Sequence, residues 1–270
     1  MKKYAVIGNP ISHSRSPLIH SIFGKTVGLD IRYDAIKVNQ NNFAATVRDL
    51  FLKESYEGLN VTLPLKELAY AFASKPSDIC LLTRASNTLW MKDGEFFADT
   101  TDGKGLVADI KSKGIKLEGS SLLVVGAGGS AKSIIPSLVD CKPSEIKIIN
   151  RTSGKAENIA SLFKDSQCKV TSGNLTDQLE NNFDGIINTS SAGVLNEKLI
   201  YPDDLFDSSS WVYDLSYSVT ETPFNREAKL KGQEEVFDGL GMLFRQAAFS
   251  FEIWTGIAPN VEETMEIYYK

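Results

Sequence analysis

Hydrophobic and polar positions follow two different periods along the first hundred residues. Short β-rich runs at 3–7, 31–38 and 58–61 predict strands, and the apolar spacing at 17–27, 43–53 and 65–73 predicts helices. Ser16 and Pro17 are typical of a helix start, with Ser16 as the N-cap, and Gly28 is typical of its end. Because strands that alternate with helices form a mostly parallel, helix-covered sheet, this region predicts an α/β unit.

A hairpin separates this unit from a second series of strands. Residues 87–91 and 95–98 flank Lys92-Asp93-Gly94, which is typical of a hairpin turn. A helix is predicted over 102–113, and the apolar run at 121–125 predicts a strand buried on both faces. Further strands are predicted at 145–150, 185–188 and 211–215. A long apolar helix at 238–254 and an amphipathic stretch at 261–269 follow, so we expect two α/β domains.

Composition and charge narrow the classes of partner. The 270 residues are 42% hydrophobic and 23% charged, which is typical of globular domains. The net charge of -5, without a long Lys/Arg block, makes nucleic acid an unexpected partner. Apolar runs fall short of the roughly 18 residues of a membrane span, and the first residues lead into a strand rather than a signal peptide. We expect a cytoplasmic protein without a membrane partner, as a monomer or homodimer.

Cysteine and histidine usage argues against a metal site. The cysteines Cys80, Cys141 and Cys168 are odd in number and far apart, without a C-x-x-C pair. This pattern favours neither a disulfide framework nor a zinc site. With only His13 and His20 in the chain, a histidine-rich metal centre cannot form. We therefore expect no metal.

A glycine-rich loop follows the apolar strand at 121–125 and precedes a predicted helix. It reads G-x-G-x-x-A, and its members are Gly126, Ala127, Gly128, Gly129, Ser130 and Ala131. In that context small residues let the backbone approach a pyrophosphate, whose charge meets free N–H groups at the helix start. The loop therefore predicts a dinucleotide site, the alternative being a glycine-rich turn without a ligand.

The next strand indicates which dinucleotide. It ends in Asn150, Arg151 and Thr152, without the acidic residue that accepts the ribose hydroxyls of NAD, and Lys155 follows in the next helix. Arg151 can pair with a 2′-phosphate, and Lys155 adds a second positive charge. The loop therefore favours NADP; the alternative is an exposed basic helix start.

Weaker signals lie at the ends of the first strands. Asn60 to Lys66 closes a predicted strand, where α/β folds place ligand sites, yet Lys66 alone is typical of a solvated helix start. Ser14 and Ser16 are consistent with turn and cap hydroxyls, and Asp102 with a carboxylate at a helix start. Individually these residues identify no site.

Taken together, these motifs resemble the shikimate dehydrogenase family over nearly the whole chain. The residues that carry the resemblance are 8–17, 60–66, Ala85-Ser86-Asn87-Thr88, Thr101-Asp102-Gly103, the glycine loop, Asn150-Arg151-Thr152, Asn188-Thr189-Ser190, Tyr217, Thr222-Pro223-Phe224 and 238–246. The resemblance implies NADPH-dependent reduction of 3-dehydroshikimate to shikimate. It also implies an N-terminal α/β substrate domain over 1–101, a Rossmann-like NADP-binding domain over 102–237, and C-terminal helices at 238–270 that return to the substrate domain.

The resemblance also assigns roles to individual residues. Lys66 and Asp102 would form the catalytic pair, in which an ammonium stabilises the charge that hydride transfer leaves on oxygen. The residues implied for the substrate are Ser14, Ser16, Asn60, Thr62, Asn87, Tyr217 and Gln246. Those implied for the cofactor, besides the glycine loop and the basic turn, are Asn188, Thr189, Leu215 and Gly239.

Four positions depart from the family pattern. Arg84 stands where glycine is usual, Thr100 where asparagine is usual, and Lys132 where arginine is usual, and Tyr217-Ser218-Val219 replaces Tyr-x-Pro. None of them removes a catalytic group, but they leave the identity of the substrate undecided. Two alternatives follow: a quinate/shikimate dehydrogenase, and a non-catalytic paralogue that binds NADP or shikimate.

Overall fold

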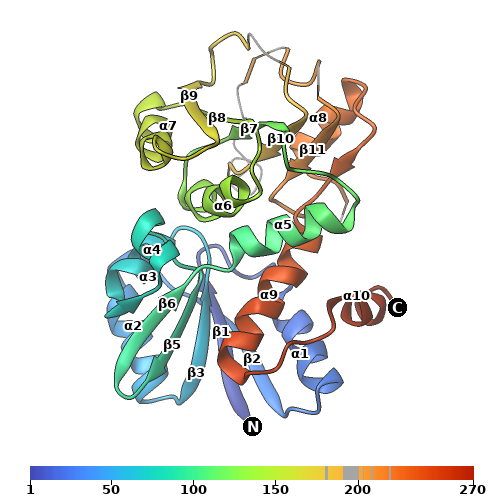
Figure 1. Cartoon of the computed structure of the whole chain (residues 1–270). Coiled ribbons are helices and arrows are strands. Elements are labelled where there is room, and N and C mark those ends of the chain that lie inside the picture. Colours follow the sequence, from blue (N-terminus) through green and yellow to red (C-terminus); the bar gives the residue numbers. More distant parts are fainter. Residues whose placement is uncertain (180–181, 191–200, 203, 208, 219) are drawn as a thin grey trace. The chain divides into compact units, whose positions relative to one another are not determined.

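The computed structural model forms two compact units, and it describes all residues except 180–181, 191–200, 203, 208 and 219 (Figure 1). Unit 1 comprises Met1–Gly105 and Leu243–Lys270, and unit 2 comprises Leu106–Met242. Both boundaries fall inside helices, α5 (Asp102–Ser112) and α9 (Leu240–Thr255). Unit 1 is therefore built from two chain segments, and unit 2 is inserted between them.

Unit 1 contains a mixed sheet in the order β2-β1-β3-β5-β6-β4. Its strands are β1 (Lys2–Gly8), β2 (Ile31–Lys37), β3 (Tyr56–Val61), β4 (Lys75–Pro76), β5 (Thr88–Lys92) and β6 (Glu95–Asp99). β1 runs parallel to β2 and β3, as βαβ connections require, and the hairpin β5–β6 adds antiparallel strands beside β3. The carboxyl end of β3 and the start of β5 consequently lie together.

Helices cover this sheet and enclose its apolar core. They are α1 (Ser16–Thr26), α2 (Phe43–Leu52), α3 (Lys66–Phe72), α4 (Asp78–Thr83), the unit 1 parts of α5 and α9, and α10 (Val261–Tyr269). Val47 and Phe51 of α2 pack with Ile7 and Leu59 of the strands. A second cluster joins Tyr4 of β1 to Trp254 of α9, whose rings stack at 5.0 Å. A 3₁₀ turn at Gln40–Asn42 precedes α2.

The start of α1 differs from the sequence prediction. Ser16 is the first helical residue, and the N-cap is Arg15, so the prediction of Ser16 as N-cap is wrong. The backbone N–H of Ser16 donates to Ser14 Oγ at 3.3 Å. The Ser-Pro pair correctly predicts the first turn of α1, but Pro17 is the second helical residue instead of the first.

Unit 2 is a fully parallel sheet in the order β12-β11-β10-β7-β8-β9. Its strands are β7 (Ser121–Val125), β8 (Glu145–Asn150), β9 (Lys169–Asn174), β10 (Gly185–Asn188), β11 (Trp211–Asp214) and β12 (Val236–Phe237). In chain order this is 6-5-4-1-2-3, the doubly wound arrangement of dinucleotide-binding folds. The order reverses between β7 and β10, so the switch point lies at the carboxyl end of β7.

The helices of unit 2 bury both faces of that sheet. They are the unit 2 parts of α5 and α9, α6 (Gly129–Asp140), α7 (Ser153–Ala160), a 3₁₀ turn at Ser161–Phe163, and α8 (Pro223–Leu230). Leu122 and Val124 face one core cluster, whereas Leu123 and Val125 face another. This confirms the prediction of a strand buried on both faces. Among the described helices none is both long and apolar enough to cross a bilayer.

Candidate active site

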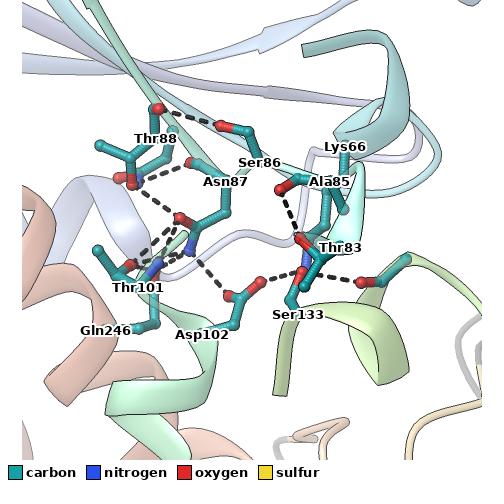
Figure 2. Close-up of polar contacts among 12 residues, drawn as sticks. Lys66, Thr83, Ala85, Ser86, Asn87, Thr88, Thr101, Asp102, Ser133 and Gln246 are labelled. Atoms are coloured by element: carbon teal, nitrogen blue, oxygen red, sulfur yellow. Dashed lines mark hydrogen bonds and ion pairs between the residues drawn. The ribbon is translucent and has the colours of Figure 1, made fainter. Parts of the chain in front are cut away.

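An ion pair joins Lys66 to Asp102 beside a network of polar residues of unit 1 (Figure 2). Lys66 is the first residue of α3 and Asp102 the first of α5. The distance from Lys66 Nζ to Asp102 Oδ2 is 2.8 Å, and the two side chains are only 12% and 7% exposed. A carboxylate that close stabilises the ammonium charge of Lys66, because little water screens the pair. The structure therefore brings together the two residues predicted as catalytic.

Asn87 holds the carboxylate of this pair from the other side. Its Nδ2 lies 2.8 Å from Asp102 Oδ1, 2.9 Å from Thr101 Oγ1 and 3.1 Å from Gln246 Oε1. Its Oδ1 accepts hydrogen bonds from the Thr101 backbone N–H at 2.9 Å and from Thr88 Oγ1 at 2.7 Å. Because both ends of the amide are bound, its orientation and that of Asp102 are fixed.

A second layer of buried polar groups supports Asn87. Asn60 Nδ2 donates to the Asn87 backbone oxygen at 3.2 Å and to Ser250 Oγ at 2.9 Å. Asn60 Oδ1 accepts from Tyr33 Oη at 2.7 Å. Ser250 Oγ also lies 2.8 Å from Thr88 Oγ1 and 3.1 Å from Thr101 Oγ1. Asn60, predicted as a substrate residue, is thus engaged on both sides within the protein.

Sequence reasoning singled out neither Tyr33, Thr88, Thr101 nor Ser250 as a site residue. Thr88 and Thr101 stood in motifs that carried the resemblance, next to Asn87 and Asp102. Ser250 follows Gln246 by four residues on α9, so it lies on the same helix face. That spacing is the signal that could have identified it.

The other predicted substrate residues are divided between the two units. Ser14 and Thr62 are partly exposed in unit 1, and Ser16 and Gln246 are buried there. Ser16 is a hydrogen-bond partner of the Tyr33 hydroxyl, which connects it to Asn60. Tyr217 belongs to unit 2, where it is partly exposed.

The glycine loop of unit 2 joins β7 to α6. Gly126 adopts φ +107°, and a Cβ there would lie 2.6 Å from Thr189 Oγ1, so this position requires glycine. Gly128 is the N-cap of α6, is exposed, and has no atom within 4 Å of a Cβ built on it. Ala127 and Ala131 are buried, while Gly129 and Ser130 are partly exposed. The loop leaves the helix start open to an anion.

The basic turn follows β8, beside this loop. Asn150 Nδ2 donates to the Thr152 backbone oxygen at 3.0 Å, and Asn174 Nδ2 donates to the Arg151 backbone oxygen at 3.3 Å. Arg151, Thr152 and Lys155 are exposed. The side chains of Asn150 and Asn174 therefore hold the backbone of the turn, and the two cationic side chains extend from it.

On the other side of β7, the ends of β10 and β11 are tied together. Asn188 Nδ2 donates to Asp214 Oδ1 at 3.0 Å, and Thr189 Oγ1 donates to the Val125 backbone oxygen at 3.0 Å. Burial raises the pKa of Asp214 to about 6. Gly239 N–H donates to the Ser216 backbone oxygen at 2.9 Å, and a side chain at Gly239 would collide with the Leu215 backbone. The carboxyl end of the sheet on this side of β7 thus contains Asn188, Thr189, Leu215 and Gly239.

The departures from the family pattern have distinct structural settings. Arg84 is exposed and adopts φ +52°, ψ +36° at the end of α4, a left-handed conformation that the glycine of the family pattern would adopt without strain. Thr100 is buried, and its Oγ1 has no hydrogen-bond partner within the described residues. Lys132 lies in α6 and interacts with another group of the protein. Val219 lies outside the described residues.

Among the described residues, no group of three or more His, Cys, Asp or Glu side chains is placed to hold a metal ion. The three cysteines are free thiols, and burial raises the pKa of Cys80 to about 11. That shift leaves Cys80 as a protonated, unreactive core side chain at neutral pH.

Comparison with known proteins gives matches over most of the chain. A model of the shikimate dehydrogenase substrate binding domain matches residues 6–89, and a model described as shikimate / quinate 5-dehydrogenase matches residues 107–200. A model of the shikimate 5'-dehydrogenase C-terminal domain matches residues 239–267. These stretches contain Lys66, Asn87, the glycine loop and Gln246.

Individual relatives and structures agree with these models. A shikimate dehydrogenase (NADP(+)) from Hahella chejuensis is 41% identical, with 96% of each chain covered. Among solved structures, an Ael1 enzyme from Pseudomonas putida matches with a TM-score of 0.89 at 33% identity, covering 99% of this chain and 98% of that one. The Thermus thermophilus shikimate 5-dehydrogenase in complex with NADP(H) and shikimate matches with a TM-score of 0.84 at 29% identity, covering 98% of each chain. The chain therefore belongs to the shikimate dehydrogenase family.

Proposed function

We propose that this protein catalyses the NADPH-dependent reduction of 3-dehydroshikimate to shikimate in aromatic amino-acid biosynthesis. The observation that carries the proposal is the largely buried Lys66–Asp102 pair, 2.8 Å apart and fixed by Asn87, in a member of the shikimate dehydrogenase family. A binding-only paralogue would have no need to keep an ammonium and a carboxylate paired and desolvated, which costs free energy.

The pair has separate tasks in this reaction. As a ketone is reduced, its carbon gains a hydride and its oxygen gains negative charge. Lys66 Nζ is a cationic donor that would stabilise this charge and transfer a proton to the oxygen, which completes the alcohol. Asp102 holds Lys66 Nζ through Oδ2, and in shikimate oxidation it would help to return the proton to the lysine.

The substrate would lie among the polar side chains that surround this pair. We propose that Ser14 and Ser16 bind the substrate carboxylate and that Thr62, Asn87 and Gln246 contact its ring and hydroxyls. Tyr217 of unit 2 is proposed as a further substrate residue. Asn60 donates to the backbone oxygen of Asn87 and is itself held by Tyr33 and Ser250, so we propose that Asn60 positions Asn87.

The cofactor residues fit a dinucleotide. NADPH, when bound, would supply the hydride. The glycine loop would receive the pyrophosphate, because Gly128 leaves open space at the start of α6. Asn150, Arg151, Thr152 and Lys155 would hold the adenosine 2′-phosphate, and Asn188, Thr189, Leu215 and Gly239 would lie at the nicotinamide end.

The direct test is a spectrophotometric assay of the purified protein with shikimate or quinate, each with NADP or NAD. We expect shikimate with NADP to be the best pair by a wide margin. Equal efficiency with quinate would favour a quinate/shikimate dehydrogenase. Binding of NADP and shikimate without hydride transfer at any pH would favour the non-catalytic paralogue.

Substitution of Lys66 tests the catalytic pair. Lys66→Ala should lower kcat by roughly two to four powers of ten, the usual range for a general acid–base group, while shikimate still binds. Lys92→Ala is a matched control, since Lys92 is an exposed lysine at the far end of β5 in the same unit. If both variants keep the wild-type kcat, Lys66 has no catalytic role.

The location and the oligomeric state of the protein are two further proposals. We propose that it is a cytoplasmic enzyme that functions as a monomer or homodimer, like other biosynthetic enzymes with small-molecule substrates. Light scattering of the purified protein with and without NADP would distinguish the two oligomeric states.

A further inference from the structure

Asp214 is a buried carboxylate at the carboxyl end of β11, and the proposed chemistry does not use it directly. Asp214 is 2% exposed. Its Oδ1 accepts hydrogen bonds from Asn188 Nδ2 and from the Ser216 backbone N–H, both at 3.0 Å. The side chain of Thr222, the N-cap of α8, also interacts with this carboxylate and favours its charged form. One carboxylate thus connects the end of β10, the loop after β11 and the start of α8.

The topology places this junction on the nicotinamide side of the sheet. In a doubly wound sheet the dinucleotide crosses the switch point, with one half on each side of the first strand. The basic turn follows β8, so the adenosine half would be bound on the side of β8 and β9. The ends of β10 and β11 lie on the opposite side of β7, where the nicotinamide half would be bound.

The contacts of this junction set the backbone of the loop that would face the nicotinamide. Leu215 N–H donates to the Asn188 backbone oxygen at 2.9 Å, and Gly239 N–H donates to the Ser216 backbone oxygen at 2.9 Å. The absence of a side chain at Gly239 lets its backbone pack directly on Leu215. A shift of Asp214 would therefore move Leu215 and Gly239 together.

We propose that Asp214 is a positioning residue, which fixes the loop over the nicotinamide ring by joining Asn188, Ser216 and Thr222. The proposal rests on the proposed function, because it takes NADPH as the ligand of this sheet edge. The carboxylate accepts from Asn188 Nδ2 and from the Ser216 backbone N–H, whereas an apolar side chain would leave these donors unpaired. Burial raises the pKa of Asp214 only to about 6, so the carboxylate still carries its charge at neutral pH.

The experiment compares Asp214→Ala with Asp184→Ala. Asp184 accepts from the Ser121 backbone N–H at 2.7 Å, at the amino end of the strands of the same sheet, so it is a hydrogen-bonded carboxylate away from the proposed site. Three quantities are measured in the intact protein: the Kd for NADPH, the fluorescence of bound NADPH, and kcat with shikimate and NADP. Thermal unfolding shows whether each variant is folded.

For Asp214→Ala we expect kcat to fall by about tenfold or more and the fluorescence of bound NADPH to change towards that of the free cofactor. The Kd for NADPH should change by less than about threefold, because the pyrophosphate and 2′-phosphate contacts remain. Asp184→Ala should match the wild type in all three quantities. If Asp214→Ala does not fold, Asn188→Ala breaks the same hydrogen bond from β10 and should give the same pattern.

The inference is overturned if kcat and bound-NADPH fluorescence of folded Asp214→Ala or Asn188→Ala equal those of the wild type. It is also overturned if the Kd for NADPH weakens in step with kcat, since the carboxylate would then act on binding as a whole. A wild type that binds NADPH but does not oxidise shikimate would refute the proposed function alone. The fluorescence comparison would still decide the role of Asp214.

Discussion

Arg84 ends α4 in the left-handed region, at φ +52° and ψ +36°, with its backbone N–H bonded to the Cys80 oxygen. This conformation places Cβ close to the following carbonyl and costs a non-glycine residue about 1 kcal/mol. Glycine avoids the cost but gives the unfolded chain more freedom. The glycine that the family pattern places at position 84 therefore has an explanation in backbone conformation, which does not involve the substrate.

Arg84→Gly should stabilise the protein slightly and leave its activity nearly unchanged. The expected gain is about 0.5 kcal/mol, or a rise in Tm of about 1–2 °C for a chain of this size, measured by calorimetry. Lys142→Gly is a matched control, because Lys142 has φ +56° after α6 in unit 2. A loss of activity in Arg84→Gly alone would show that the guanidinium takes part in the substrate site.

At the scale of elements, long periodic segments could be predicted from the sequence and short or polar ones could not. The helices over 43–53 and 102–113 and the strands over 121–125 and 145–150 occur close to their predicted bounds. β4 and β12 have two residues each, too few for a period to show. β9 reads KVTSGN and none of its residues is buried, so it lacks the alternation of a strand with one buried face.

The candidate site was predictable where its residues stand in local motifs. Lys66 and Asp102 begin helices, Asn87 directly precedes β5, and the glycine loop follows β7, so each lies next to a predictable element. The contacts beneath them were not, because Tyr33, Asn60 and Ser250 meet only through the fold, although Asn60 itself stands in a predicted motif. Asn60 and Ser250 are 190 positions apart, and no local pattern reports such a contact.

The turn between β8 and α7 is the element that should decide cofactor choice. Its backbone is held by Asn150 and Asn174, so truncation of the exposed Arg151 should leave the turn in place. A guanidinium paired with the 2′-phosphate gains a charge-assisted contact that NAD cannot supply. Arg151→Ala should therefore raise the KM for NADP by about tenfold or more, or about 1.4 kcal/mol, with little change for NAD.

Steady-state kinetics with both cofactors tests this expectation. Lys164→Ala serves as the control, because Lys164 is an exposed lysine of the same unit after the 3₁₀ turn at Ser161–Phe163. Equal losses with NADP and NAD in Arg151→Ala would contradict selective recognition of the 2′-phosphate by this residue.

At the scale of the whole molecule, two buried titratable groups give the stability opposite dependences on pH. His20 of unit 1 is fully buried and stacks on Tyr33 at 4.1 Å, and burial lowers its pKa to about 3. Below about pH 6.5 the unfolded chain binds a proton at His20 that the folded state does not, so stability is lost as pH falls. Asp214 of unit 2 has a raised pKa of about 6, so its contribution to stability increases as pH falls through that value.

Substitution of His20 isolates the first of these effects, since Asp214 is the same in both proteins. His20→Phe keeps an aromatic ring in the stack with Tyr33 but cannot take a proton. When the pH is lowered from about 7 to about 4.5, the free energy of unfolding of the wild type should fall by about 3 kcal/mol more than that of His20→Phe. The slope is about 1.4 kcal/mol per pH unit below the unfolded pKa of histidine, about 6.5. Urea unfolding at both pH values measures this difference. The other histidine, His13, is exposed, and His13→Gln should keep the wild-type dependence. If His20→Phe and the wild type lose the same free energy, acid unfolding of this protein does not proceed through protonation of the buried imidazole.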